Sequence, residues 1–84
     1  MTYIATFYSH FGAIRFKKLC EANQMPARLM PVPRSLSSSC GTCVRYEGGQ
    51  ACPGGRYPEE VEQVVQEVQE VEQGYRSLYR AKDS

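Results

Sequence analysis

Residues 2–8 read Thr2-Tyr3-Ile4-Ala5-Thr6-Phe7-Tyr8, a run rich in aromatic and β-branched residues. Such residues favour strands, and a run that is apolar on both faces indicates a strand at the centre of a sheet. Ser9 follows directly and is a good N-cap residue for a helix. The sequence therefore predicts a central strand followed at once by a helix.

The segment after Ser9 has the pattern of a helix packed on one side. Its apolar residues recur at helical spacing, with basic residues opposite them, and the helix must end before Pro26. A second strand is expected over Ala27–Pro33, at the edge of the sheet because its prolines cannot donate to a ladder. A third short strand, Thr42–Glu47, is followed by a glycine-rich loop over residues 48–57.

The last part of the chain, from Pro58 onward, predicts an amphipathic helix. Its apolar residues alternate by three and four positions: Val61, Val64, Val68, Val71, Tyr75 and Leu78. Proline at the first position and glutamates in the opening turns suit the positive end of a helix, and Arg76, Arg80 and Lys82 suit the negative end. Because this helix is longer than the sheet, its exposed end is expected either to fold over the Cys40 rim or to pair with a second copy as a weak homodimer.

Together these elements predict an α+β fold, a two-layer β-α-β-β-α sandwich with both helices on one face. The first two strands are parallel through a right-handed crossover, and the third lies between them, antiparallel to both. This arrangement resembles a ferredoxin-like sheet that lacks its last strand. We expect one domain over residues 1–84: a βαββ core with the Cys40 loop (2–47), a glycine-rich loop (48–57) and the long C-terminal helix (58–82).

Length and composition narrow the function classes. The chain has 84 residues and a formal net charge of +1, which does not favour nucleic acid as a partner. It contains no run of about 18 apolar residues and no pattern of a signal peptide, so we expect a cytoplasmic protein without a membrane segment. There the four cysteines stay mostly reduced, and paired cysteines are more often catalytic or metal-binding than structural.

The segment Pro31–Gly41 carries the strongest chemical signal. Arg34 and a cluster of serines that includes Ser39 precede Cys40, and polar, positively charged surroundings favour the reactive thiolate. Gly41 permits a tight turn that leaves the sulfur accessible. Because the C-terminal ends of parallel strands meet at one rim, His10 and the start of the first helix are expected beside this loop, where His10 is a candidate to assist Cys40.

The pattern P-x-P-R…S-S-S-C-G in this segment resembles a family of small bacterial proteins described as selenium/sulfur carriers. The likeness extends upstream through Tyr3–Tyr8 and Ala13–Leu19 and covers roughly residues 2–46. The resemblance implies that Cys40 holds sulfur or selenium, as a persulfide or perselenide, between a donor enzyme and an acceptor enzyme. Such a protein is a covalent carrier rather than a stand-alone enzyme, and it needs no cofactor.

Two alternatives use the other cysteines. Cys40-Gly41-Thr42-Cys43 has CxxC spacing, which makes Cys43 a candidate resolving thiol in a thiol–disulfide protein, or otherwise a plain strand residue. A zinc-binding interaction module is the second alternative, with Cys40, Cys43 and Cys52 as ligands and His10 or Cys20 as the fourth. Geometry argues against zinc, because the third strand carries Cys52 away from the Cys40 rim.

Overall fold

A computed structural model describes residues 1–36, 38–68 and 74–81. Along the chain, the elements in this part are the strand β1 (Thr2–Phe7), the helix α1 (His10–Ala22), the strands β2 (Ala27–Pro31) and β3 (Thr42–Glu47), the 3-10 turn η1 (Pro53–Gly55), and the strands β4 (Val61–Glu67) and β5 (Tyr75–Arg80). The strands form one sheet with the order β2-β3-β1-β4-β5, and every neighbouring pair is antiparallel.

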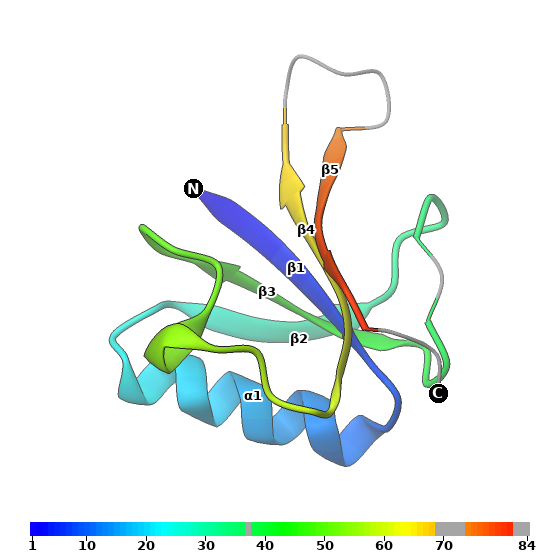
Figure 1. Ribbon diagram of the computed structural model, residues 1–84. Helices are drawn as coiled ribbons and strands as arrows, with labels where there is room; N and C mark the ends of the chain where they lie inside the picture. Colours follow the sequence, from blue (N-terminus) through cyan, green and yellow to red (C-terminus); the bar gives the residue numbers. More distant parts are fainter. Residues whose placement is uncertain (37, 69–73, 82–84) are drawn as a thin grey trace.

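The first half of the chain has the arrangement that its sequence predicts. β3 lies between β1 and β2 and is antiparallel to both, so β1 and β2 run parallel to each other. α1 crosses one face of the sheet (Figure 1) and begins where the Ser9 hydroxyl accepts a 3.2 Å hydrogen bond from the backbone N–H of Gly12. Within the described residues, no helix is long and apolar enough to cross a membrane.

The predicted C-terminal helix is wrong, and with it the fold class. In place of a helix the chain forms β4 and β5, so the described part of the protein is mostly β, with one α-helix of 13 residues. The valine spacing indicates a helix, but it also fits a strand that contains a β-bulge. Phe7 of β1 faces Val61, whereas Thr6 faces Gln63, which leaves Glu62 as an extra residue. The bulge brings Val61 and Val64, three residues apart, onto one face of a strand.

A second bulge lies further along, in the pairing of β4 with β5. Val64 faces Tyr79 and Val65 faces Ser77, so one residue of β5 is again extra. Val61 and Val64 are fully buried within the monomer. The predicted helical seam for a homodimer therefore does not form. One seam residue, Val71, and Lys82 at the predicted helix end lie outside the described residues.

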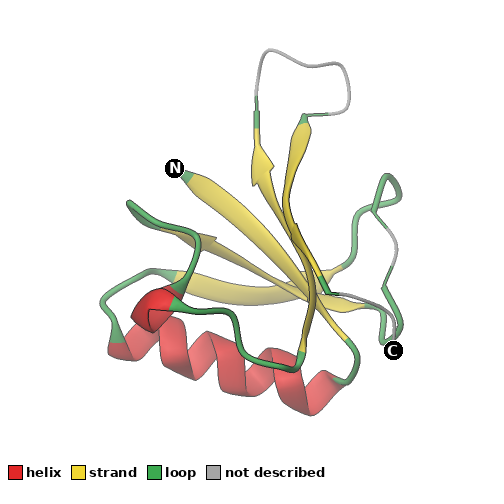
Figure 2. Cartoon of the chain, viewed as in Figure 1, coloured by secondary structure: helices red, strands yellow, loops and turns green. Residues whose placement is uncertain are grey.

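The comparison with a ferredoxin-like sheet is corrected in the same way. The strand that was expected to be missing is present, because β4 pairs with β1. In the described residues it is the second helix that is absent. The segment 48–60 with η1 lies on the α1 side of the sheet instead (Figure 2), where Pro53 is buried. The segment contains four glycines and two prolines, which disfavour a helix.

Side chains on the two faces of the sheet form separate clusters. On the α1 side, the ring of Phe16 lies 5.2 Å from the ring of Phe7 and 5.1 Å from that of Tyr46. On the other side, a smaller buried cluster consists of Ile4, Cys43 and Val65, against which Met30, Val32, Leu36 and Tyr75 pack. Both faces are thus covered near the rim where β1 and β2 end.

Candidate functional site

The loop of residues 32–41 joins β2 to β3 at the rim where β1 also ends. The ladder continues one step into the loop, because the backbone N–H of Val32 donates to the carbonyl of Gly41 at 3.2 Å. The N–H of Leu36 donates to the carbonyl of Pro33 at 3.0 Å and closes a turn. Gly41 has φ of +76°, a conformation that glycine adopts without strain. These hydrogen bonds and Gly41 define the backbone at both ends of the loop.

This loop crosses from one face of the sheet to the other. Its first half places Val32 and Leu36 over the face that carries Ile4. Its second half passes the end of β1, where the Ser38 hydroxyl donates to the carbonyl of Phe7 at 3.2 Å. Cys40 then packs against the cluster on the α1 side. The loop holds Cys40 at the rim, half-buried.

The Cys40 sulfur makes two polar contacts. Its thiol donates to the carbonyl of Thr42 at 3.3 Å, and Sγ lies 3.9 Å from the hydroxyl oxygen of Ser38. A hydroxyl has one hydrogen, and that of Ser38 goes to Phe7, so Ser38 has none to offer the sulfur. A carbonyl oxygen only accepts, so in the contact with Thr42 the Cys40 thiol is the donor.

Ser39, next to Cys40, is fixed by a residue that the sequence did not single out. Its backbone N–H donates to Oε1 of Glu62 at 3.2 Å, and its hydroxyl donates to Oε2 at 2.8 Å. Hydrogen bonds to a charged acceptor are stronger than neutral ones. Glu62 is the bulged residue of β4. Sequence reasoning missed it because it placed Glu62 in the first turns of a helix.

Of the other predicted site residues, His10 has a polar contact near Cys40, and no such contact is found for Arg34 among the described residues. Nδ1 of His10 lies 3.3 Å from the hydroxyl oxygen of Thr42, the residue whose carbonyl accepts from Cys40. His10 thus reaches the site through Thr42 and makes no hydrogen bond to Cys40. Arg34 is exposed and has no hydrogen bond or ion pair within the described ranges. Ser37, part of the predicted serine cluster, lies outside the described residues.

The four cysteines are free thiols with different surroundings. Cys20 and Cys43 are fully buried. Burial raises the pKa of Cys20 to about 12 and that of Cys43 to about 11, with a smaller contribution to the latter from the nearby Cys40. Cys52 is half-buried at the start of η1, beyond the far end of β3. A strand of six residues spans about 20 Å, so Cys52 lies toward the opposite rim.

This distribution gives the zinc alternative no support. In the part of the chain that is described, no three histidine, cysteine, aspartate or glutamate side chains are grouped so that they could hold a metal ion. Cys43, moreover, gives its hydrogen to the carbonyl of Pro31 at 3.6 Å. The proposed ligand set of Cys40, Cys43 and Cys52 is therefore spread over two faces and two rims.

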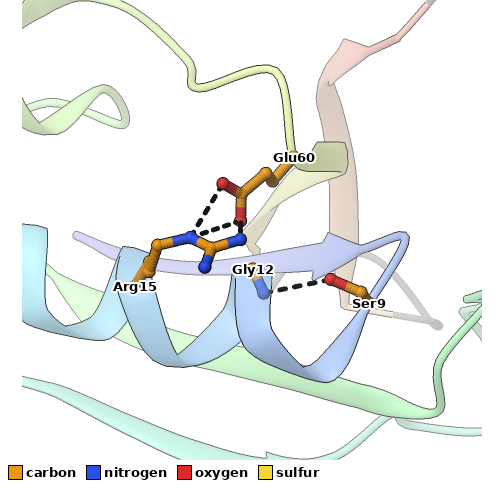
Figure 3. Close-up of polar contacts among 4 residues, drawn as sticks. All are labelled: Ser9, Gly12, Arg15 and Glu60. Atoms are coloured by element: carbon orange, nitrogen blue, oxygen red, sulfur yellow. Dashed lines mark hydrogen bonds and ion pairs between the residues drawn. The ribbon is translucent and has the colours of Figure 1, made fainter.

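Glu60 fixes the start of α1 from the same segment that carries Glu62. Nε of Arg15 donates to Oε1 of Glu60 at 2.9 Å, and its terminal nitrogen donates to Oε2 at 2.8 Å (Figure 3). The N–H of Tyr8 donates to the carbonyl of Glu60 at 3.3 Å. Gly12 lies beside this carboxylate, and a Cβ there would come within 2.7 Å of Oε2. Residues 60–62 therefore hold α1 through one glutamate and the Cys40 loop through the other.

These features define a class: a small sheet protein that presents one half-buried cysteine on a fixed loop at the rim of its sheet. The family described as "Putative Se/S carrier protein-like" matches residues 2–52, and the chain belongs to this family. The matched range holds all four cysteines but ends before β4 and β5. No curated protein and no solved structure matches the chain.

Proposed function

We propose that the protein carries sulfur or selenium, as a persulfide or perselenide on Cys40, from a donor enzyme to an acceptor enzyme. Membership of the family supports this function. The observation that carries the assignment to Cys40 is its position: it is half-buried at the rim of the sheet, whereas Cys20 and Cys43 are fully buried. A carrier thiol must be reached by two different enzymes, and a rim allows this approach.

The transfer needs no oxidant. The Cys40 thiolate attacks the outer sulfur of a cysteine persulfide on the donor, and a new S–S bond forms as the donor's S–S bond breaks. The donor cysteine leaves as a thiolate, so the number of electrons is conserved. The acceptor's nucleophile then attacks the outer sulfur and releases Cys40 as a thiolate. For selenium, a selenium atom takes the place of the transferred sulfur.

The resting geometry suggests what a donor must supply. The Cys40 thiol gives its hydrogen to the Thr42 carbonyl, and that proton must leave before the sulfur attacks. Neither His10 nor Arg34 makes a hydrogen bond to Cys40 within the described residues. In this proposal the proton acceptor belongs to the donor enzyme, as is reasonable for a carrier that works only in complex. The reducing cytoplasm is the compartment in which such a free thiol persists.

The thiol–disulfide alternative fits the site less well. A resolving cysteine must form a thiolate and reach its partner, but Cys43 is fully buried and burial raises its pKa to about 11. It also packs on the face of the sheet opposite to the one that Cys40 contacts. We therefore propose Cys40 as a carrier thiol that acts without Cys43.

A loading experiment tests the proposal. The protein is incubated with a cysteine desulfurase and ³⁵S-labelled cysteine, and protein-bound label that a reductant releases is counted. We expect Cys40→Ser to abolish the label and Cys52→Ser, the matched control at the other half-buried cysteine, to retain it. Equal labelling of Cys40→Ser and wild type would refute the assignment. Intact mass of protein purified without reductant tells a sulfur adduct from a selenium adduct.

A further inference from the structure

The Cys40 loop is tied to a part of the chain that the family match does not include. Residues 2–52 match the family, and Glu62 lies ten residues beyond that range. Its two carboxylate oxygens accept from the backbone N–H and the hydroxyl of Ser39, at 3.2 and 2.8 Å. Ser39 immediately precedes Cys40. The family-matched segment thus provides the thiol, and β4 provides a side chain that holds it.

The position of Glu62 follows from the bulge in β4. At this point two residues of β4 occupy the space of one opposite β1, because Phe7 faces Val61 and Thr6 faces Gln63. Bulges bend a strand and redirect side chains. Val61 keeps its place in the core, fully buried, while Glu62 reaches the loop across the end of β1. The same end of β1 accepts the hydrogen of Ser38.

We propose that Glu62 is a positioning residue: it holds Ser39 so that Cys40 stays half-buried with its thiol hydrogen on the Thr42 carbonyl, and release of Ser39 frees the sulfur to react. The proposal that Glu62 holds Ser39 in place rests on the hydrogen bonds alone. The part about sulfur transfer rests on the proposed function. While Ser39 is hydrogen-bonded to Glu62, Cys40 is protected from oxidants and alkylating agents. A partner that separates Ser39 from Glu62 exposes the thiol.

The test measures alkylation of Cys40 in the full chain with iodoacetamide at neutral pH, by peptide mass spectrometry. When a thiol reacts through local opening, its rate follows the population of the open form. Loss of two hydrogen bonds to a charged acceptor in Glu62→Ala should raise the rate roughly tenfold. Ser39→Ala should have a smaller effect, since its backbone N–H still donates. Glu62→Gln, with one amide oxygen left to accept, should restore part of the protection.

Glu60→Ala is the matched control, because Glu60 lies two residues away on the same segment but contacts Arg15 instead of the loop. It should leave the Cys40 rate unchanged. The double variant with Ser39→Ala and Glu62→Ala should react no faster than Glu62→Ala alone, because both changes remove one interaction.

An unchanged or slower rate in Glu62→Ala overturns the proposal, and so does an equal increase in Glu60→Ala, which would indicate general loosening. If Glu62→Ala fails to fold, the comparison of Ser39→Ala and Glu62→Gln with wild type decides in the same way. Alkylation needs no sulfur donor, so this result is independent of the loading assay. A positioning effect without sulfur loading would leave Glu62's role intact and refute the carrier function.

Discussion

Cys40 and Cys43 are three residues apart in the chain, yet they pack against opposite faces of the sheet. Cys40 contacts the cluster on the α1 side, and Cys43 belongs to the cluster with Ile4 and Val65 on the other. The cause is that β3 begins between them, at Thr42, and side chains alternate along a strand. The CxxC motif therefore contains one thiol at the rim and one thiol in the core, on opposite faces of the sheet.

The first prediction follows from this difference in burial. At neutral pH, iodoacetamide should label Cys40 much faster than Cys43 or Cys20, whose pKa values burial raises to about 11 and about 12. Peptide mass spectrometry after short reaction times measures each site. In urea all four cysteines should react at similar rates, which is the control. Labelling of Cys43 as fast as that of Cys40 in the folded protein would contradict this account of the site.

The order and pairing of β1, α1, β2 and β3 agree with the sequence prediction because each local signal agrees with the tertiary structure, although β2 ends at Pro31 rather than Pro33. Ser9 caps α1, the prolines keep β2 at the sheet edge, and the short β3 fits between two parallel strands. The meeting of the two strand ends at one rim followed from topology alone. That inference predicts that His10 lies beside the Cys40 loop. In the structure, Nδ1 of His10 lies 3.3 Å from the hydroxyl oxygen of Thr42, the residue that follows this loop.

The second half was mispredicted because bulges change the period of a strand. Valines spaced by three and four residues indicate a helix if the strand period is strictly two, but the extra residue at Glu62 absorbs the difference. The β-branched side chain of valine favours a strand, and this signal was outweighed by spacing. Glu62 was hidden for the same reason. Only the three-dimensional register shows that its side chain reaches Ser39.

The second prediction concerns alkaline pH. A thiol whose pKa is raised in the folded state keeps its proton there, while the unfolded chain loses it at about pH 9. The unfolded state then binds fewer protons, so the free energy of unfolding falls as pH rises. Stability should be constant up to about pH 9 and fall between about pH 9 and 12. The slope is at most about 1.4 kcal/mol per pH unit for each of Cys20 and Cys43.

Urea denaturation at a series of pH values measures this slope. Burial also raises the pKa of Tyr46, so its phenol adds to the loss above about pH 10. Cys20→Ala should lower the free energy of unfolding at neutral pH. Above about pH 9, the free energy of unfolding should fall less steeply with pH than in the wild type, because the Cys20 thiol no longer contributes. A free energy of unfolding that stays level to pH 11 would show that these groups ionise without unfolding the protein.

The third prediction uses the close approach of Gly12 and Glu60. Glycine inside a helix costs about 1 kcal/mol relative to alanine, so Gly12→Ala should stabilise α1. A Cβ at this position, however, meets the Glu60 carboxylate at 2.7 Å and its Cβ at 3.0 Å. We expect Gly12→Ala to bring no gain in the wild type. In the Glu60→Ala background we expect a gain of less than about 1 kcal/mol, because the carboxylate is gone but the Cβ at position 60 stays.

The measurement is a double-mutant cycle: urea denaturation gives the free energy of unfolding of the wild type, both single variants and the double variant. The ion pair of Arg15 with Glu60 is exposed, so Glu60→Ala by itself should change the free energy of unfolding by less than about 1 kcal/mol. Equal effects of Gly12→Ala in the two backgrounds would mean that Glu60 moves aside without cost.

The last prediction concerns a buried hydroxyl next to Cys43. Thr6 faces Cys43 on one side and Gln63 on the other, and it is 1% exposed. Its Oγ1 has no hydrogen-bond partner among the described residues. A buried hydroxyl without a partner is destabilising, and valine has the same shape without the polar atom. Thr6→Val should therefore raise the free energy of unfolding by about 1 kcal/mol, measured by urea denaturation.

Thr6→Ser is the matched control, because it keeps the hydroxyl and removes only the methyl group. It should lower the free energy of unfolding by about 1 kcal/mol, the contribution of one buried methyl group. Both variants should leave the alkylation rate of Cys40 unchanged, since Thr6 contacts neither Ser39 nor Glu62 through a hydrogen bond. If Thr6→Val is less stable than wild type, the hydroxyl has a partner in the folded protein. The face of the sheet that carries Cys43 would then be held by a polar contact as well as by packing.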